Sequence, residues 1–226
     1  NETIDTSSQK EFVDSFDVLE GSAGAITLGD IGTLTITNGA RIQAQTDTIS
    51  TGNAGEISIS AESIEVDASS IRTGVLGEGD AGSISLNAVR VESSVEDYSQ
   101  SLISLNGSTI SSSSGRFVLG VDRSSNTGSA GSISVKGGAI LIDGSTIEAK
   151  TNSTEIHAAA TIELIAHAEN VENISGIQAI DFNVSSATEG ASDAGSITLT
   201  ATGSSLSLSN GSSITSVTGS SAGVFS

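Results

Sequence analysis

The stretch that decides the fold is AGSISVKGGAILIDGSTI, residues 130–147. It opens with an Ala-Gly pair and then alternates aliphatic with other residues through ISV and again through ILI. Asp143-Gly144 follows, and the stretch closes on Ile147. Alternation with a period of two is typical of β-strands, and Asp-Gly is typical of a sharp turn. The stretch therefore predicts three short strands separated by tight turns.

Both halves of this pattern recur along the chain. Copies of the first half, Ala-Gly-x-Ile-x-aliphatic, begin at Ala23, Ala54, Ala81, Ala130 and Ala194, and a broken copy begins at Ala222. Copies of the second half begin at Leu34, Ile64, Ile103, Ile140 and Leu206. A repeat of about 28 residues holding three short strands predicts stacked units, in which each strand pairs with the same strand of the next unit. We therefore expect an all-β fold, a parallel β-helix (solenoid) of about six coils with loop insertions.

Turn residues follow the second strand of each unit. They are Asn38, Asp67, Asn106, Asp143 and Asn210, most of them followed by glycine. Asn, Asp and Gly tolerate the left-handed backbone that a sharp corner requires. We expect these five positions to stack in one line, in which no two carboxylates are neighbours.

Two stretches depart from the pattern. Residues 89–101 either bulge out of one coil, which we prefer, or contribute a strand to an additional coil. Residues 156–184 keep the alternation without the Ala-Gly signature, and we interpret them as one degenerate coil.

We treat residues 1–226 as a single β-helix domain, with the coils in residues 23–221. Residues 1–22 are either the last strand of a partial preceding coil or a short cap, since Phe12, Val13, Phe16 and Leu19 have helix-like spacing. Residues 222–226 start a further coil. Such ends fit a fragment of a longer array, which we favour, or a protomer that stacks head to tail.

Composition excludes several classes of function. The chain holds 27 acidic and 8 basic residues, for a net charge of −19, so nucleic acid and anionic membranes are disfavoured as partners. It contains no cysteine, which excludes disulfides, cysteine nucleophiles and Cys-based zinc sites. No apolar run approaches the about 20 residues of a membrane-spanning helix.

The two signatures together resemble the repeat region of filamentous-haemagglutinin-like exoproteins of two-partner secretion systems, closest to the cyanobacterial type. The likeness covers about residues 21–226 and is clearest in the copies at Ala23, Ala54, Ala130 and Ala194. It implies a right-handed parallel β-helix, export to the cell surface or medium, and an adhesive role. The secretion domain of that family carries an Asn-Pro-Asn motif, whereas this chain has no proline, so the resemblance is to the stalk alone.

Acidic residues in the loops are candidate calcium ligands, because calcium prefers oxygen ligands. The candidates are Glu78, Asp80, Asp97 and Asp193, with Glu92, Glu96 and Glu189 nearby. The calcium-binding nonapeptide of β-rolls is absent, and we favour a solvated acidic face with no bound cofactor. The two histidines, His157 and His167, could form a metal pair with Glu155, Glu163 or Glu169, but we favour positions on a solvated face or in an irregular coil for both.

We expect a secreted or cell-surface adhesin or structural stalk, or a subunit of an extracellular filament, that is not an enzyme. Loops at residues 87–101, 114–130 and 185–193 would meet an extracellular glycan or protein, with head-to-tail self-association as a further possibility. A polysaccharide lyase or hydrolase is the alternative, but no motif joins acids to Arg41, Arg72, Arg90, Arg116 or Arg123, so no catalytic residue is expected. Ice binding is less favoured, because Thr33, Thr35 and Thr37 correspond to Ser63, Glu65 and Asp67 in the next unit.

Overall fold

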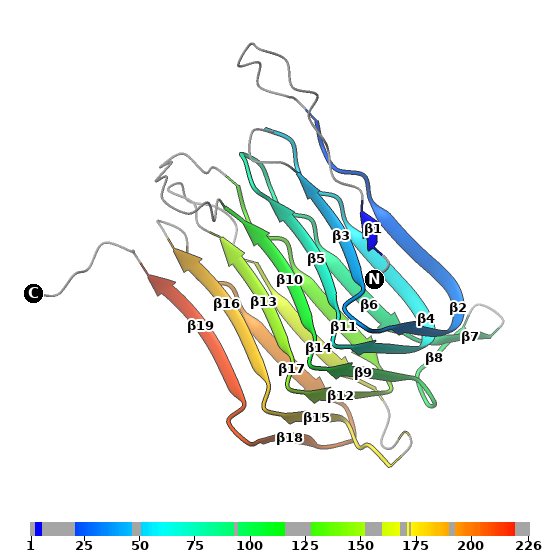
Figure 1. Ribbon diagram of the computed structural model, residues 1–226. Helices are drawn as coiled ribbons and strands as arrows, with labels where there is room; N and C mark the ends of the chain where they lie inside the picture. The colour runs from blue at the N-terminus through cyan, green and yellow to red at the C-terminus, as the bar shows by residue number, and fades with distance from the viewer. Residues whose placement is uncertain are drawn as a thin grey trace, which may run out of the picture.

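The computed structural model describes residues 3–5, 21–46, 51–92, 95–115, 128–151, 160–167, 171, 173–189 and 193–219. Within these ranges the chain is all β, with nineteen strands and no helix. The strands of both large sheets run parallel, and six successive units supply them (Figure 1).

The last strand of every unit lies in a 7-stranded sheet of order β1-β3-β5-β10-β13-β16-β19. Its strands are β1 (Thr3–Asp5), β3 (Arg41–Thr46), β5 (Ser70–Val75), β10 (Thr109–Ser114), β13 (Thr146–Thr151), β16 (Asn183–Glu189) and β19 (Ser213–Gly219).

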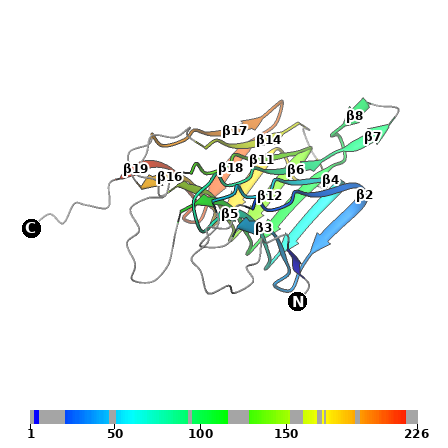
Figure 2. The same ribbon diagram turned by 90° about the horizontal axis from the view of Figure 1, so that it is seen from above.

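The first two strands of every unit lie in a 10-stranded sheet. First strands are β6 (Ile84–Ala88), β11 (Ile133–Gly137), β14 (Ile162–Ala166) and β17 (Ile197–Ala201). Second strands are β9 (Leu102–Asn106), β12 (Ala139–Asp143), β15 (Ile177–Ile180) and β18 (Leu206–Ser209). In the first two units the two strands are continuous, as β2 (Ile26–Ile36) and β4 (Ile57–Asp67). A separate antiparallel pair, β7 (Arg90–Glu92) and β8 (Val95–Asp97), projects from one corner (Figure 2).

Equivalent residues of neighbouring units pair directly. Ile84 pairs with Ile57 on one side and with Ile133 on the other. Because the register does not slip among β4, β6 and β11, the aliphatic positions of these units lie over one another. Between β2 and β4 the register shifts by one residue, between Leu28 and Ile31, and the aliphatic positions match on both sides of the shift.

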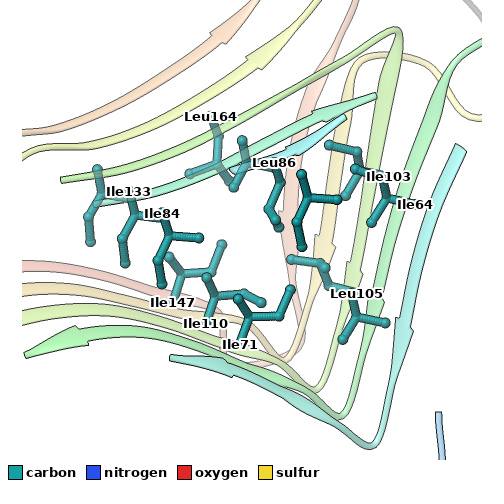
Figure 3. Close-up of a cluster of buried hydrophobic side chains, with 14 of the residues drawn as sticks. Ile64, Ile71, Ile84, Leu86, Ile103, Leu105, Ile110, Ile133, Ile147 and Leu164 are labelled. Atoms are coloured by element: carbon teal, nitrogen blue, oxygen red, sulfur yellow. The ribbon is translucent and has the colours of Figure 1, made fainter. Parts of the chain in front are cut away.

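The stacked aliphatic residues form the core. Isoleucines and leucines of the first, second and third strands point into a common interior (Figure 3). Ile64, Ile71, Ile103, Leu105 and Ile110 are all fully buried. In the sixth unit, by contrast, Leu206 and Ile214 are 47% and 44% exposed.

One edge of the interior is polar. The inward side chains of the third strands include small hydroxyls, which bond to the backbone of the Ala-Gly loops. Ser112 Oγ donates to the carbonyl of Gly82 at 2.9 Å and accepts from the N–H of Gly131 at 2.8 Å. These bonds satisfy buried polar groups that would otherwise destabilise the fold.

The glycine of the Ala-Gly signature is required by close approach. A Cβ on Gly82 would lie 2.0 Å from the carbonyl oxygen of Gly55, and one on Gly131 would lie 2.1 Å from that of Gly82. The fifth unit has Ala160 at this position, so it is the degenerate unit in this respect too.

The corner between the second and third strands shows a difference from our expectation. The five turn residues do not form one line. Asp67, Asn106 and Asp143 pair with one another, and the left-handed residue is the one that follows, namely Ala68, Gly107 and Gly144 with φ of 46°, 53° and 55°.

The first and sixth units have one extra residue at this corner. There Asn38-Gly39 and Asn210-Gly211 are both left-handed, with φ of 61° and 74° and of 50° and 82°. Asn-Gly is the preferred sequence for such a turn. The fifth unit uses Asp181, φ 49°, which the sequence pattern did not single out.

The irregular stretches are resolved as follows. Residues 89–101 are an insertion, as preferred, because β9 pairs with β4 and β12 in normal register. The degenerate coil supplies β14, β15 and β16, and β16 extends to Glu189. The predicted loop 185–193 is therefore wrong over residues 185–189, because the inward Ser186 and Thr188 are small hydroxyls and gave no aliphatic signal. The loop predicted at 87–101 likewise starts later, since β6 ends at Ala88.

At the N-terminal side, Ile4 pairs with Ile42, so β1 occupies the position of a third strand next to β3. Phe12, Val13, Phe16 and Leu19 lie outside the described residues, as do residues 222–226, 116–127 and 152–159.

The left-handed corner generates a stability prediction. Ala68→Gly should raise the free energy of unfolding by about 0.5–1 kcal/mol, because an L-residue pays for φ > 0 and glycine does not. Gly107→Ala should lower it by about 1 kcal/mol through conformation alone, because a Cβ there meets no atom within 4 Å. Urea denaturation of both variants checks this, and a neutral Gly107→Ala would contradict the account of the corner.

Candidate functional site

The most distinctive surface feature is the hairpin of β7 and β8. It is inserted between β6 and β9, at the corner where the second unit has only Glu62 and the fourth has only Gly138. Its register pairs Arg90 with Asp97, and Val95 is 65% exposed. The hairpin thus extends laterally without disturbing the stack.

Tyr98, directly after β8, is the centre of a polar and aromatic cluster. Its hydroxyl lies 2.9 Å from Glu96 Oε2 and 3.2 Å from Asn87 Oδ1. Its ring centroid is 4.4 Å from that of His167, with the planes inclined by 33°. We call these four residues, Asn87, Glu96, Tyr98 and His167, the Tyr98 cluster.

The cluster joins the third and fifth units across the fourth. Tyr98 belongs to the third unit and His167 follows the first strand of the fifth. Between them the fourth unit has Gly137-Gly138, whose backbone anchors both sides: His167 N donates to Gly137 O at 2.9 Å, and Gly138 N donates to Ser101 Oγ at 2.7 Å. A Cβ on Gly138 would lie 1.9 Å from Tyr98 O, so only glycine allows the turn to lie this close.

Two titratable groups at this corner are perturbed. Burial of the ring, with a hydrogen bond to the Glu96 carboxylate, raises the pKa of Tyr98 above its ordinary value. The backbone N–H of Ser99 donates to Asp97 Oδ1 at 2.9 Å, which lowers the pKa of that exposed carboxyl. Both shifts follow from local hydrogen bonding and burial.

Ion pairs near the corner are exposed. Arg90 Nε lies 3.8 Å from Glu62 Oε1, and Lys136 Nζ lies 3.5 Å from Glu163 Oε2. Solvent-exposed pairs of this kind stabilise a protein by less than about 1 kcal/mol each. These pairs therefore contribute more to the charge of the surface than to the stability of the fold.

The candidate calcium ligands are not brought together. Asp80 Oδ1 accepts from the N–H of Ser129 at 2.7 Å, in a line where Asn53 Oδ1 likewise accepts from Asp80 N at 2.9 Å. Glu78 and Asp193 are exposed in the loops before Ala-Gly pairs, and Asp97 lies on the hairpin. In the described ranges no three Asp, Glu, His or Cys side chains form a group that could hold a metal.

The other candidates are scattered as well. His167 is described and stacks on Tyr98, whereas His157, Glu155 and Glu169 lie outside the described residues. Arg41 and Arg72 are exposed on β3 and β5, and Arg116 and Arg123 are outside the described ranges.

The sequence pattern did not indicate the Tyr98 cluster, although Tyr98 is the one tyrosine of the chain and lies in the predicted insertion. No periodic signal connects Tyr98 to His167. The position of Tyr98 depends on the absence of a side chain at Gly138, and nothing in the sequence pattern relates that glycine to Tyr98.

No family model, curated protein or solved structure matches this chain. None of the described residues belongs to a helix long and apolar enough to span a membrane.

Titration of Tyr98 gives a direct test of the cluster. The chain has one tyrosine and no tryptophan, so phenolate absorbance reports this residue alone. The midpoint should lie above 10.0. Glu96→Gln should bring it closer to that value, while Glu65→Gln, a change of an exposed acid on β4, should not.

The same shift predicts a pH dependence of stability. A folded pKa above the unfolded value means that the neutral phenol stabilises the fold below about pH 10, and that this contribution is lost as pH rises through the folded pKa. A midpoint at or below 10.0 would contradict the described environment of Tyr98.

Proposed function

We propose that this chain is part of a right-handed parallel β-helix that serves, without catalysis, as a secreted or cell-surface stalk or adhesin, or as a filament subunit. One observation carries the proposal. The third unit accepts residues 89–101 where the second has the single residue Glu62, and the strands on both sides keep their register. A scaffold that tolerates lateral insertions at a corner is suited to present loops.

The distribution of variable segments supports presentation. The corner between the second and third strands has only two to four residues in every unit, and it is held by hydrogen bonds such as Asn106 Nδ2 to Asp67 Oδ1 at 2.8 Å. The other two corners differ in length from unit to unit. Loops at these two edges would therefore carry recognition, while the third edge maintains the rod.

The likeness of the repeat to filamentous-haemagglutinin-like exoproteins supports the handedness, export and adhesive role. The net charge of −19 favours partners that are neutral or basic.

The Tyr98 cluster is the surface that we expect to contact a partner. Tyrosine offers an apolar ring face together with a polar hydroxyl, and Glu96 and Asn87 add hydrogen-bonding oxygens beside it. Alternating apolar faces and hydroxyl groups are characteristic of neutral sugars. A neutral extracellular glycan is therefore the best-matched ligand class.

Excision of residues 89–100 tests whether the insertion is an appended loop that the fold does not need, and whether this loop binds a neutral glycan. It joins Ala88 to Ser101, which reproduces the one-residue spacing of the second unit and keeps the Ser101 hydroxyl that accepts from Gly138 N. The variant should retain the far-UV circular dichroism spectrum of the parent and melt within a few degrees of it. Unfolding of the variant would contradict the view of the insertion as an appended loop.

Adhesion is measured on the same two proteins with an array of neutral glycans. The parent should bind and the excised variant should not. Equal binding by both, or binding by neither, would contradict presentation by this insertion. Release of new reducing ends or unsaturated products from a polysaccharide would instead show an enzyme.

A further inference from the structure

The third strands include a region in which basic residues outnumber acidic ones. The strands β3, β5, β10 and β13 together contain Arg41, Arg72 and Lys150, and their one acidic residue is Glu148. In the whole chain the proportion is reversed, with 8 basic and 27 acidic residues. We call the outward side of these four strands the third-strand face. Its charge is opposite in sign to the net charge of the chain.

The two arginines of this face are not neutralised by a neighbouring acid. Glu148 is engaged elsewhere, because its Oε2 lies 2.5 Å from Lys150 Nζ and its Oε1 accepts from Ser111 Oγ at 3.2 Å. No carboxylate of the described residues forms an ion pair with Arg41 or Arg72. Both arginines are exposed. Two guanidinium groups are therefore available to an anion from solution.

Strand register brings the two arginines close together. β3 and β5 lie side by side (Figure 1), with Arg41 opposite Ser70 and Gln43 opposite Arg72. A strand spacing of about 4.8 Å and a rise of about 3.3 Å per residue place Cα of Arg41 about 8 Å from that of Arg72, on a diagonal. Like charges on neighbouring strands destabilise a sheet, and an anion between them removes this cost. The serine hydroxyl and the glutamine amide, on the other diagonal, are further hydrogen-bond donors.

We propose that Arg41 and Arg72 form a second binding site, which takes the carboxylate groups of an extracellular acidic polysaccharide built from uronic acids. A guanidinium group binds a carboxylate through two parallel N–H···O bonds, a planar geometry that an ammonium group does not offer. The Tyr98 cluster lies at the corner between the first and second strands, so this site is separate from it. The inference therefore goes beyond the neutral-glycan site proposed above.

The spacing of the units favours a polysaccharide over a small anion. Successive third strands are about 4.8 Å apart, which is comparable to the length of one pyranose residue in an extended chain. A polysaccharide that crosses the strands would thus meet one unit with each sugar. Beyond the arginines, the outward positions include the half-buried Thr109, Ser113 and Thr146, whose hydroxyl groups suit the hydroxyl groups of sugars.

The negative net charge does not prevent such binding at physiological ionic strength. Salt there screens exposed charges that are more than about 8 Å apart, so the nearest groups dominate the interaction. The nearest strands, β3, β5 and β10, contain no acidic residue. The attraction is local, and it should weaken as salt is raised further.

The test is calorimetric titration of the 226-residue chain with an oligogalacturonate, and with the methyl ester of the same oligosaccharide, at physiological ionic strength. The acid should bind at least about tenfold more tightly than the ester, which lacks the charge. Arg72→Gln should weaken binding of the acid by at least about tenfold, because charge-assisted hydrogen bonds are lost. Lys136→Gln removes the same charge from β11, outside this face, and should change the affinity by less than about twofold.

Several results would overturn the proposal. They are absence of binding by the parent, equal binding by the parent and an Arg41→Gln/Arg72→Gln variant, and an equal loss in Lys136→Gln and Arg72→Gln. A stronger response to a sulfated polymer than to the oligogalacturonate would contradict the carboxylate assignment. Both arginines are exposed, so the variants should retain the circular dichroism spectrum of the parent.

The variant that lacks residues 89–100 shows whether the two sites are independent. It should bind the oligogalacturonate as tightly as the parent does, whatever happens to its binding of neutral glycans. Loss of oligogalacturonate binding on excision would assign that binding to the insertion and would overturn the site at Arg41 and Arg72.

Discussion

Parallel pairing of each strand with its equivalent in the next unit is the constraint on which the rest of this structure depends. Parallel strands lie about 4.8 Å apart, so each paired residue of the two large sheets meets its counterpart in the next unit at that distance. A residue type is acceptable only if it can lie directly on a similar residue. Isoleucine packs on isoleucine, as at Ile71, Ile110 and Ile147. Where the backbone of one unit approaches that of the next, as at Gly55 and Gly82, only glycine leaves room for the carbonyl.

The same constraint explains the side-chain hydrogen bonds. A small polar residue at the corner between the second and third strands can accept from the backbone N–H of the preceding unit, and the equivalent residue of that unit can do the same in turn. Ser145 Oγ accepts from Ser108 N at 3.0 Å, and Ser108 Oγ accepts from Ser69 N at 3.3 Å. Fully engaged ladders of this kind stabilise a chain that has no disulfides and few aromatic residues.

Much of this fold could be predicted from the period-two alternation and the Ala-Gly copies, because both are local consequences of the stacking. The corners could not be aligned correctly, since Asn106-Gly107 and Asn210-Gly211 share a sequence but belong to turns of different length. Residues 185–189 were missed as a strand because their inward positions are hydroxyls that bond to backbone, not aliphatics. The Tyr98 cluster could not be predicted, because it joins units three and five across a glycine pair. The adhesive role remains a proposal that rests on the scaffold and on the resemblance of its repeat.

The most direct measurement of the in-register stacking uses spin labels along one line of outward residues of the third strands. Gln43, Arg72, Ser111, Glu148, Ser185 and Thr215 pair in succession. The chain has no cysteine, so Gln43→Cys can be combined with Ser185→Cys or with Thr215→Cys without background labelling. Gln43 and Ser185 are four strand spacings of about 4.8 Å apart, which predicts an electron–electron distance of about 19 Å, and Gln43 and Thr215 are five apart, which predicts about 24 Å. The pair Arg72→Cys and Thr215→Cys, again four spacings apart, should also give about 19 Å. Distances that fail to grow by about one strand spacing per unit would contradict the stacking itself.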